Sequence, residues 1–414
     1  MERVSCIQCC RRLVALDFAH YADREQAFVK HTFLDKYLPS LMGKVCSWCD
    51  EFVYVDGFAG PWKSSAGENF EDTSFGIALN HMTKVRETYQ SKGRIIKMRA
   101  FLVEKLPSSF AQLQEAAGKF PNIEVTPFHG MMEEHAANIA SLIPSAAFSF
   151  TLIDPKGFPE IGAMMPLLKR KNAEALVNFM FDFANRFAGT DLIPALEAWL
   201  SALGRTDWRK DVEGLSGIDR EQKLERLAAE SLQVTGGYEY APVITVDKPL
   251  HDRPLYKLIF LSRHSEGLKV FRDSEEKALG AQATARSATK AKKKAANSAI
   301  GDLFADGADA VPNDRSSQVI KRSHKQAPIR LNERLVAAGI TGIAWGELWP
   351  PILEDYSVTR SWLGRQVNEL RKMGKISAPG WPSERKQIPD DEQLLIWSGY
   401  NSNENREFRG HNTL

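Results

Sequence analysis

The sequence has no uninterrupted apolar stretch of about 18 residues, the length that a helix needs to span a membrane. Its first residues, MERVSCIQCCRRL, lack the apolar core of a secretory signal peptide. We therefore expect a cytoplasmic protein with no membrane partner. An excess of one charge is also missing, since 54 Lys and Arg stand against 52 Asp and Glu, for a net charge of +2. This balance neither requires nor excludes a nucleic-acid partner.

Cysteine is scarce, with five residues in the chain. An odd number without a secretion signal argues against a disulfide framework. The pairs Cys6–Cys9 and Cys46–Cys49 have the CxxC spacing of zinc ligands, although the gap between the pairs is longer than in common zinc ribbons. Reduced, partly buried thiols are the alternative, and we predict no metal site.

From residue 51 onward, runs rich in β-branched and aromatic residues alternate with helical patterns. The predicted strands cover 51–56, 95–105, 122–130, 148–155 and 175–183, and the helices between them cover 73–90, 106–120, 131–143 and 161–171. Such alternation is typical of βαβ units with right-handed crossovers and predicts a doubly wound parallel sheet. A helix over 21–43, which we expect to stop or kink near Pro39, precedes the first strand.

Two more predicted strands, 240–247 and 254–263, follow a helical stretch at about 191–233. Their short polar connection predicts an antiparallel pair. Five parallel strands closed by an antiparallel hairpin form the layout of class I S-adenosylmethionine-dependent methyltransferases. We therefore predict an α/β, Rossmann-like class I methyltransferase fold for residues 1–275. It includes a helical N-terminal segment over 1–50 and a helical insertion at about 191–235.

The remaining chain divides into a linker and a small domain. Residues 276–326 are rich in Ala, Ser, Asp and Lys, with little to bury, and predict a basic low-complexity linker that is helical around its lysines. Residues 327–414 carry three helical patterns and two strand patterns, which indicate a winged helix-turn-helix domain. Its helices would cover 331–339, 344–353 (broken by Pro350 and Pro351) and 357–373, the last as recognition helix, and its wing would cover 382–392.

Open α/β sheets bind ligands beyond the carboxyl ends of their strands, so the strand ends are the candidate site. Glycine lets a loop turn sharply and approach a ligand, and a carboxylate accepts hydrogen bonds from both hydroxyls of a ribose. The predicted cofactor-binding residues are Asp56, Gly57, Phe58, Ala59, Gly60, Glu104 and His129. A simple turn, a solvated strand end and a loop histidine are the alternatives for Gly57–Gly60, Glu104 and His129, respectively.

The stretches VYVDGFAGPW, FLVEK, TLIDPKG, ALVNFMFDFANRF and YKLIFLSRHSEGLKVFRDS, in this order, resemble the three-Cys-motif partner (TcmP) family over roughly residues 28–275. Lys30 matches a lysine of that family. The resemblance implies a methyltransferase-like fold in a bacterial protein that works with a second protein, and it implies no established substrate. The family's name refers to cysteines of the partner protein, and Cys6, Cys9 and Cys10 are not that signature. The C-terminal segment resembles the winged-helix domain of some members.

The stretch IDPKGF is similar to the Asp-Pro-Pro-Tyr motif of amino-methyltransferases, which implies a catalytic role for Asp154, Pro155 and Phe158. In that motif the Asp holds an exocyclic amine and the aromatic ring stacks on a flipped base. The chain departs from these patterns at Trp62, where the TcmP family has glycine, and at Lys156-Gly157, which replaces Pro-Tyr. DGFAG also resembles the cofactor loop of DNA cytosine methyltransferases, but their Pro-Cys nucleophile is not apparent.

Other polar residues suit contacts with nucleic acid. Asn185 and Arg186, after the fifth strand, are candidates for a phosphate contact or a structural ion pair. The polar side of the predicted recognition helix carries residue types that contact phosphates and base edges. These nucleic-acid-binding candidates are Arg360, Ser361, Arg365, Asn368, Arg371 and Lys372. Winged helices also dock proteins, so DNA, RNA and a partner protein all stay open.

Three functions follow from these patterns. The first is an S-adenosylmethionine-dependent methyltransferase that acts on nucleic acid, with or without a three-cysteine-motif partner protein. The second is a catalytically inactive adaptor that docks DNA or its partner through the winged helix, an alternative that Trp62 and Lys156 favour. A metal-dependent nuclease built on Asp56, Glu104 and Asp154 is the third, and no spacing in the sequence supports a shared ion.

Overall fold

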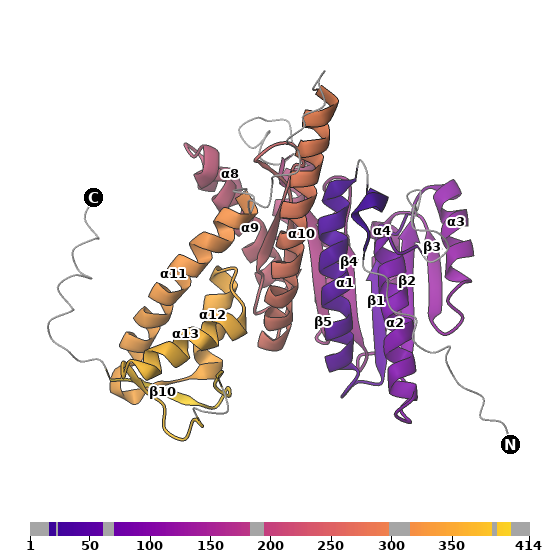
Figure 1. The fold of residues 1–414 in the computed structure, drawn as a ribbon. Helices are drawn as coiled ribbons and strands as arrows, with labels where there is room; N and C mark the ends of the chain where they lie inside the picture. Colours follow the sequence, from indigo (N-terminus) through magenta and orange to yellow (C-terminus); the bar gives the residue numbers. More distant parts are fainter. Residues whose placement is uncertain are drawn as a thin grey trace.

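The computed structural model describes residues 16–21, 24–60, 70–182, 194–297, 315–382 and 387–398 (Figure 1). A seven-stranded sheet with the order β3-β2-β1-β4-β5-β7-β6 forms its centre. The strands are β1 (Glu51–Asp56), β2 (Lys97–Glu104), β3 (Glu124–His129), β4 (Phe148–Ile153), β5 (Ala173–Phe179), β6 (Val243–Asp247) and β7 (Pro254–Leu261). The first five pair in parallel, and β7 runs antiparallel to β5 and β6. The predicted parallel sheet closed by an antiparallel hairpin is confirmed.

The central strands are apolar on both faces. Every residue of β4, FSFTLI, is buried, and β1 is buried from Phe52 to Asp56. Strands covered by helices on both sides require such continuous apolar runs, because neither face meets water. Phe52 and Tyr54 point to one layer of helices, and Val53 and Val55 point to the other.

Helices cover both faces of the sheet, which gives three layers. One face carries α1 (Glu25–Val45), α2 (Ser74–Gln90), α3 (Pro107–Ala117) and α10 (Ser265–Asn297). The other carries α4 (Met132–Leu142), α5 (Ile161–Leu168), α7 (Pro194–Ala202), α8 (Trp208–Val212) and α9 (Gly217–Gly236). In Figure 1, α1 and α10 lie side by side along the sheet. A methyltransferase-like α/β fold is therefore present, as the sequence predicted.

Helix α1 continues through Pro39 to Val45, so it does not stop there, and a kink at Pro39 stays a prediction. The predicted break at Pro350 and Pro351 was wrong, because α12 (Trp345–Asp355) continues through both. Each proline removes a backbone donor. Buried neighbours on both sides of each proline, such as Leu38, Leu41, Trp349 and Ile352, hold the helix against the core, so tertiary packing outweighs the lost hydrogen bonds.

The segment predicted to be a linker is helical at both ends. Helix α10 extends to Asn297 and α11 (Arg315–Ala338) begins at Arg315, while 298–314 lie outside the described residues. The first part of this segment also buries side chains, contrary to the expectation. Apolar and polar residues at alternating spacings of three and four form one buried stripe along α10: Leu268, Phe271, Glu275, Ala278, Gln282 and Ala285. Composition hid this stripe because four of its six residues are alanines or polar residues.

The C-terminal part contains three helices and a small antiparallel sheet. Helix α11 is much longer than the predicted 331–339, and the third helix, α13, covers Arg360–Lys372. The sheet has the order β8-β10-β9, with β8 (Ile343–Ala344), β9 (Ile376–Ser377) and β10 (Leu394–Trp397). The sequence predicted β9 and β10 but missed β8. The wing predicted at 382–392 lies partly outside the described residues, and 1–275 and 327–414 as separate domains stay predictions.

None of the helices in the described ranges is long and apolar enough to cross a lipid bilayer.

Candidate functional site

The strand order reverses between β1 and β4, and open α/β sheets bind ligands at such a point, beyond the carboxyl ends of the strands. Asp56 is the last residue of β1, and Asp154 directly follows β4. The loop Gly57–Gly60 leaves β1 at the same edge. The structure therefore brings together the strand-end residues that the sequence predicted for the first and fourth strands.

Asp56 is fully buried at the start of this loop. Its carboxylate accepts hydrogen bonds from the Tyr54 hydroxyl (3.1 Å), the Ser74 hydroxyl (2.6 Å) and the Phe58 amide (3.0 Å). Burial raises the pKa of Asp56, the bonds from Ser74 and Phe58 oppose that rise, and the nearby Asp154 charge adds to it. Asp56 thus joins β1, the loop and the first residue of α2, and its carboxylate does not face the surface.

The loop Gly57–Gly60 lies over the ends of neighbouring strands. The Gly57 amide donates to the Leu152 carbonyl (3.1 Å), and the Ala59 amide donates to the Val103 carbonyl (2.9 Å). A Cβ atom on Gly60 would collide with Oε2 of Glu104. Ala59 is buried and Phe58 half-buried, so these two side chains pack the loop down.

Glu104 ends β2 and keeps one oxygen available. Its Oε1 accepts a hydrogen bond from the Leu106 amide (2.7 Å), whereas Oε2 lies against Gly60 and accepts none from any residue that the structure describes. Glu104 is paired in register with His129 of β3. The exposed His129 ring lies 4.9 Å from the ring of Phe110, centroid to centroid. The predicted cofactor residues Gly60, Glu104 and His129 are therefore neighbours along one edge.

The carboxylate of Asp154 accepts hydrogen bonds from side chains of two different elements. Lys30 of α1 donates from Nζ to its Oδ2, and Asn178 of β5 donates from Nδ2 to its Oδ1 (2.7 Å). Asn178 is buried, and its Oδ1 has no hydrogen-bond partner within the described part of the chain. Sequence reasoning missed this contact because Lys30 and Asp154 are 124 positions apart, and the family resemblance marked Lys30 without giving it a partner.

The other residues after β4 have mixed surroundings. Pro155 is buried and Lys156 is exposed. Phe158 packs edge-on against Phe179 (centroids 5.5 Å apart) and lies 6.3 Å from Trp199. Its ring therefore belongs to the aromatic cluster on the α5–α7 side of the sheet. Phe158 is half-buried, and the stacking role that the Asp-Pro-Pro-Tyr similarity implies for it stays a prediction.

The region after β5 lies partly outside the described residues, which stop at 182 and resume at 194. Strand β5 ends at Phe179, earlier than predicted, and Asp182 is buried and paired with Lys248 (2.7 Å). Trp62, Asn185 and Arg186 lie outside the described residues, so their predicted roles stay predictions.

The predicted nucleic-acid contacts on α13 fall into two groups. Arg360 is paired with Asp391 (2.7 Å) over the Trp349 ring, and Arg371 stacks on the Trp381 ring, 4.3 Å from its centroid. Asn368 is buried. These three side chains are used inside the C-terminal part.

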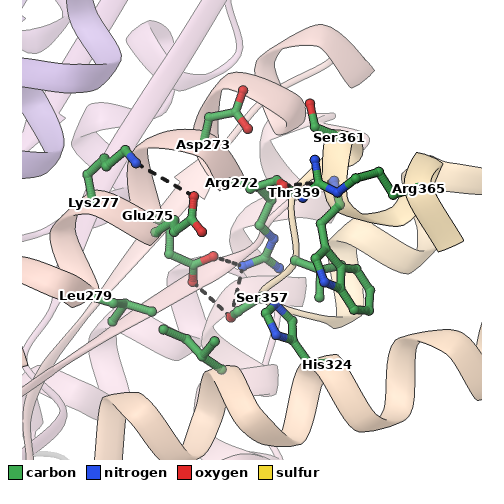
Figure 2. Close-up of a pocket in the computed structure, with 14 residues that line it drawn as sticks. Arg272, Asp273, Glu275, Lys277, Leu279, His324, Ser357, Thr359, Ser361 and Arg365 are labelled. Carbon is green, nitrogen blue, oxygen red and sulfur yellow. Dashed lines mark hydrogen bonds and ion pairs between the residues drawn. The ribbon is translucent and has the colours of Figure 1, made fainter. Parts of the chain in front are cut away.

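Ser361, Arg365 and Lys372 remain exposed, although Lys372 is paired with Glu369 (2.7 Å). Ser361 and Arg365 line a cavity of about 340 Å³ between α10, α11 and α13. Figure 2 shows Asp273 and Lys277 on one side of this cavity and Thr359, Ser361 and Arg365 on the other.

Side chains at the floor of this cavity connect α10, which covers the sheet, to α12 of the C-terminal part. Arg272 of α10 is buried and donates to the carbonyls of Leu353 (2.6 Å) and Glu354 (2.8 Å) at the carboxyl end of α12. It is also paired with Glu275 (2.6 Å), which in turn accepts a hydrogen bond from Ser357 (3.1 Å; Figure 2). Burial raises the pKa of Glu275, and the Arg272 charge opposes that rise.

The cysteine pair in the described part of the chain has the surroundings of ordinary core thiols. Cys46 and Cys49 are buried, and burial raises the pKa of Cys46 to about 12. Within the described ranges, no three His, Cys, Asp or Glu side chains form a cluster that could hold a metal ion. Cys6 and Cys9 lie outside those ranges.

No protein-family model and no curated protein matches the chain, so the TcmP resemblance stays a prediction. Among solved structures, the chain is similar to a candidate methyltransferase from Thermobifida fusca YX. The identity is 13%, the match covers 58% of this chain and 82% of that one, and the TM-score is 0.30.

Two further solved structures are similar at the same level. One is loganic acid methyltransferase with SAH, at 10% identity and a TM-score of 0.30, where the match covers 68% of this chain and 92% of that one. The other is protein LPL1258 from Legionella pneumophila, at 10% identity and a TM-score of 0.33, where the match covers 63% of this chain and 91% of that one. Similarities this low carry no argument, and the fold assignment rests on the strand order.

Proposed function

We propose that this protein binds S-adenosylmethionine beside the loop Gly57–Gly60 and Glu104 and transfers its methyl group to nucleic acid. The observation that carries the proposal is the meeting of Gly60 with the available oxygen of Glu104, beside the point where the strand order reverses. The TcmP-type partner protein belongs to the same proposal and rests on the sequence resemblance alone.

The residues at this edge fit a nucleoside. Oε2 of Glu104 is an ionisable acceptor beside a residue with no side chain, which suits a ribose hydroxyl. His129 and Phe110 supply an aromatic surface next to it, which suits an adenine ring. Met132 lies below the loop, where a Cβ on Gly57 would come within 2.9 Å of its Cγ. Glu104 and the ring pair thus supply an acidic and an aromatic contact, and the buried Met132 supports the loop from below.

Bound S-adenosylmethionine supplies an electrophilic methyl group on a positively charged sulfur. Asp154 then accepts an N–H hydrogen bond from the acceptor amine and orients its lone pair, so that catalysis comes mainly from positioning. Lys30 and Asn178 keep the Asp154 carboxylate in place by donating to both of its oxygens.

The nucleic-acid half of the proposal rests on the C-terminal part. Its three helices and three-stranded antiparallel sheet suit a winged helix-turn-helix domain, with α13 as the recognition helix. Arg365 and Ser361 on α13 are exposed, as are Lys321 and Lys325 on the neighbouring α11. Exposed cations of this kind attract phosphates without selecting a sequence.

Isothermal titration calorimetry of the full chain with S-adenosylmethionine tests the first half. Glu104→Gln keeps an oxygen for the Leu106 amide but replaces the available acceptor by a donor, so affinity should fall about tenfold. Glu115→Gln, an exposed acid on α3, is the matched control and should bind like the wild type. Absence of heat from the wild-type protein at saturating cofactor would rule the proposal out.

The second candidate function is a methyltransferase-like adaptor without turnover. It is favoured by the occupation of both Asp154 oxygens by the chain's own side chains. The two functions differ in one result: the adaptor binds S-adenosylmethionine but transfers no labelled methyl group to pooled DNA, RNA or protein.

A further inference from the structure

Asp154, the carboxylate predicted to hold an acceptor amine, is already hydrogen-bonded to an amine of this chain, that of Lys30. Lys30 extends from α1 to the carboxyl end of β4, where its Nζ contacts Oδ2 of Asp154. Its charge also acts on Asp56 at the end of β1. The Lys30 amine therefore lies beside the junction of β1 and β4, the place where this sheet type binds its ligands.

Lys30 differs from the other lysines of the same helix. Its side chain is 11% exposed, whereas those of Lys36 and Lys44, which pair with Asp35 and Glu266, are 48% and 46% exposed. A long cationic side chain is seldom buried unless it is paired. Asp154 provides the pairing for Lys30, with a side chain that is itself 18% exposed, so a narrow part of this ion pair reaches the outside.

We propose that Lys30 is a methylation site of the protein itself, with its ε-amine as an acceptor for the methyl group of S-adenosylmethionine. This inference rests on the proposed function, because it uses the same cofactor. Its structural basis is that one side chain meets both requirements of an acceptor: an amine nitrogen, and an N–H bond directed at the carboxylate that orients it.

The transfer balances without a further reactant. The Lys30 ammonium first gives one proton to the Asp154 carboxylate, which passes it to solvent. The neutral nitrogen then forms a bond to the methyl carbon as the carbon–sulfur bond breaks, and that electron pair stays on sulfur. The products are N-methyl-Lys30 and the neutral thioether S-adenosylhomocysteine.

The ion pair limits how many methyl groups the site takes. Methylation of lysine keeps the positive charge, so a monomethylated or dimethylated Lys30 still has an N–H to donate to Asp154. A trimethylated Lys30 has none, and would leave the carboxylate oxygen without its donor in a site with little solvent. We therefore expect one or two methyl groups and no third.

The test is incubation of the full-length protein with methyl-labelled S-adenosylmethionine, followed by peptide mass spectrometry. The label should appear on the peptide with Lys30 at a rate independent of protein concentration, since the acceptor lies in the same molecule. Lys36 should stay unlabelled. Lys30→Arg should abolish the label, Lys36→Arg should leave its amount unchanged, and Asp154→Asn should slow labelling at least tenfold.

Calorimetry on the same samples separates this inference from the proposed function. Binding of S-adenosylmethionine without any label on Lys30 overturns the inference alone. So does label spread over exposed lysines in proportion to their exposure, which indicates uncatalysed methylation, or label that survives Asp154→Asn at the wild-type rate. Absence of binding overturns both.

Discussion

Gly60 lies where the loop after β1 passes the carboxylate of Glu104, and its role follows from the absence of a side chain. A Cβ at this position would collide with Oε2 of Glu104, the oxygen that the proposed function assigns to the ribose. The backbone of Gly60 is not in the left-handed region, so an alanine is tolerated there without backbone strain. The residue is therefore required for space rather than for flexibility.

Gly60→Ala should weaken S-adenosylmethionine binding at least tenfold, about 1.4 kcal/mol, because Glu104 has to turn away from the loop. The melting temperature should change little. Calorimetry measures the affinity, and Gly43→Ala is the control, since a Cβ there meets nothing within 4 Å. Equal affinity of Gly60→Ala and the wild type would show that the Glu104 carboxylate does not face the cofactor.

Glu174 lies away from the candidate site and has a pKa that is raised by burial. It lies at the start of β5, fully covered, and accepts hydrogen bonds from the hydroxyls of Tyr37 and Ser262. Burial raises its pKa from 4.5 to about 7, and the two hydrogen bonds only partly oppose this rise. The folded chain thus keeps a proton that the unfolded chain releases.

The consequence is a stability that falls with rising pH. The contribution of Glu174 is fully present below pH 4.5 and is lost as the pH approaches 7, by about 3 kcal/mol at most. Glu174→Gln cannot ionise, so its free energy of unfolding should lack this decline. Urea titrations of both proteins at pH 5, 6, 7 and 8 check this, and parallel curves would contradict it.

At the scale of elements, α10 connects the sheet to the C-terminal part. Arg272 uses its guanidinium group to bind the last carbonyls of α12, where the partial negative charge of a helix end favours a cation. Glu354 of α12 in turn accepts a hydrogen bond from the Ala241 amide (2.8 Å) next to β6. The C-terminal part is thus tied to the sheet by hydrogen bonds in both directions.

Arg272→Lys should loosen this connection. A lysine cannot make the same set of bonds to Leu353, Glu354 and Glu275, and the buried Glu275 keeps a weaker partner. We expect a loss of roughly 3 kcal/mol, with faster hydrogen exchange at the end of α12 and unchanged exchange in β1 and β4. Arg322→Lys, an exposed change on α11, is the control. Uniform exchange changes across the sheet would contradict this role for Arg272.

The strands were predictable from the sequence because each is a short run of residues that favour the sheet and are buried on both faces. The meeting of Gly60 with Glu104 was predictable too, since parallel strands bring their carboxyl ends to one edge. The stripe of α10 was not, because Glu275 and Gln282 count as polar, and part of what pairs them when buried, Ser357 and the Asp247 amide, lies far away in the chain. The same reason hid the contact between Lys30 and Asp154.

At the scale of the whole molecule, the exposed cations of the C-terminal part decide whether it binds nucleic acid. Arg360 and Arg371 are used inside this part, so their loss should mainly lower stability. Arg365 forms no ion pair with any residue in the described ranges and lies at the edge of the cavity between α10, α11 and α13. It is therefore the side chain of α13 best placed to meet a phosphate.

Arg365→Ala should weaken binding to a mixed-sequence DNA duplex about equally for all sequences and should reduce the slope of log affinity against log salt by roughly one. Fluorescence anisotropy at several salt concentrations measures both quantities. Arg330→Ala, which removes an exposed arginine paired with Glu333 on α11, is the matched control. An unchanged slope for Arg365→Ala, with the melting temperature also unchanged, would place the nucleic-acid contact elsewhere. The cavity would then become the stronger candidate for docking a partner protein.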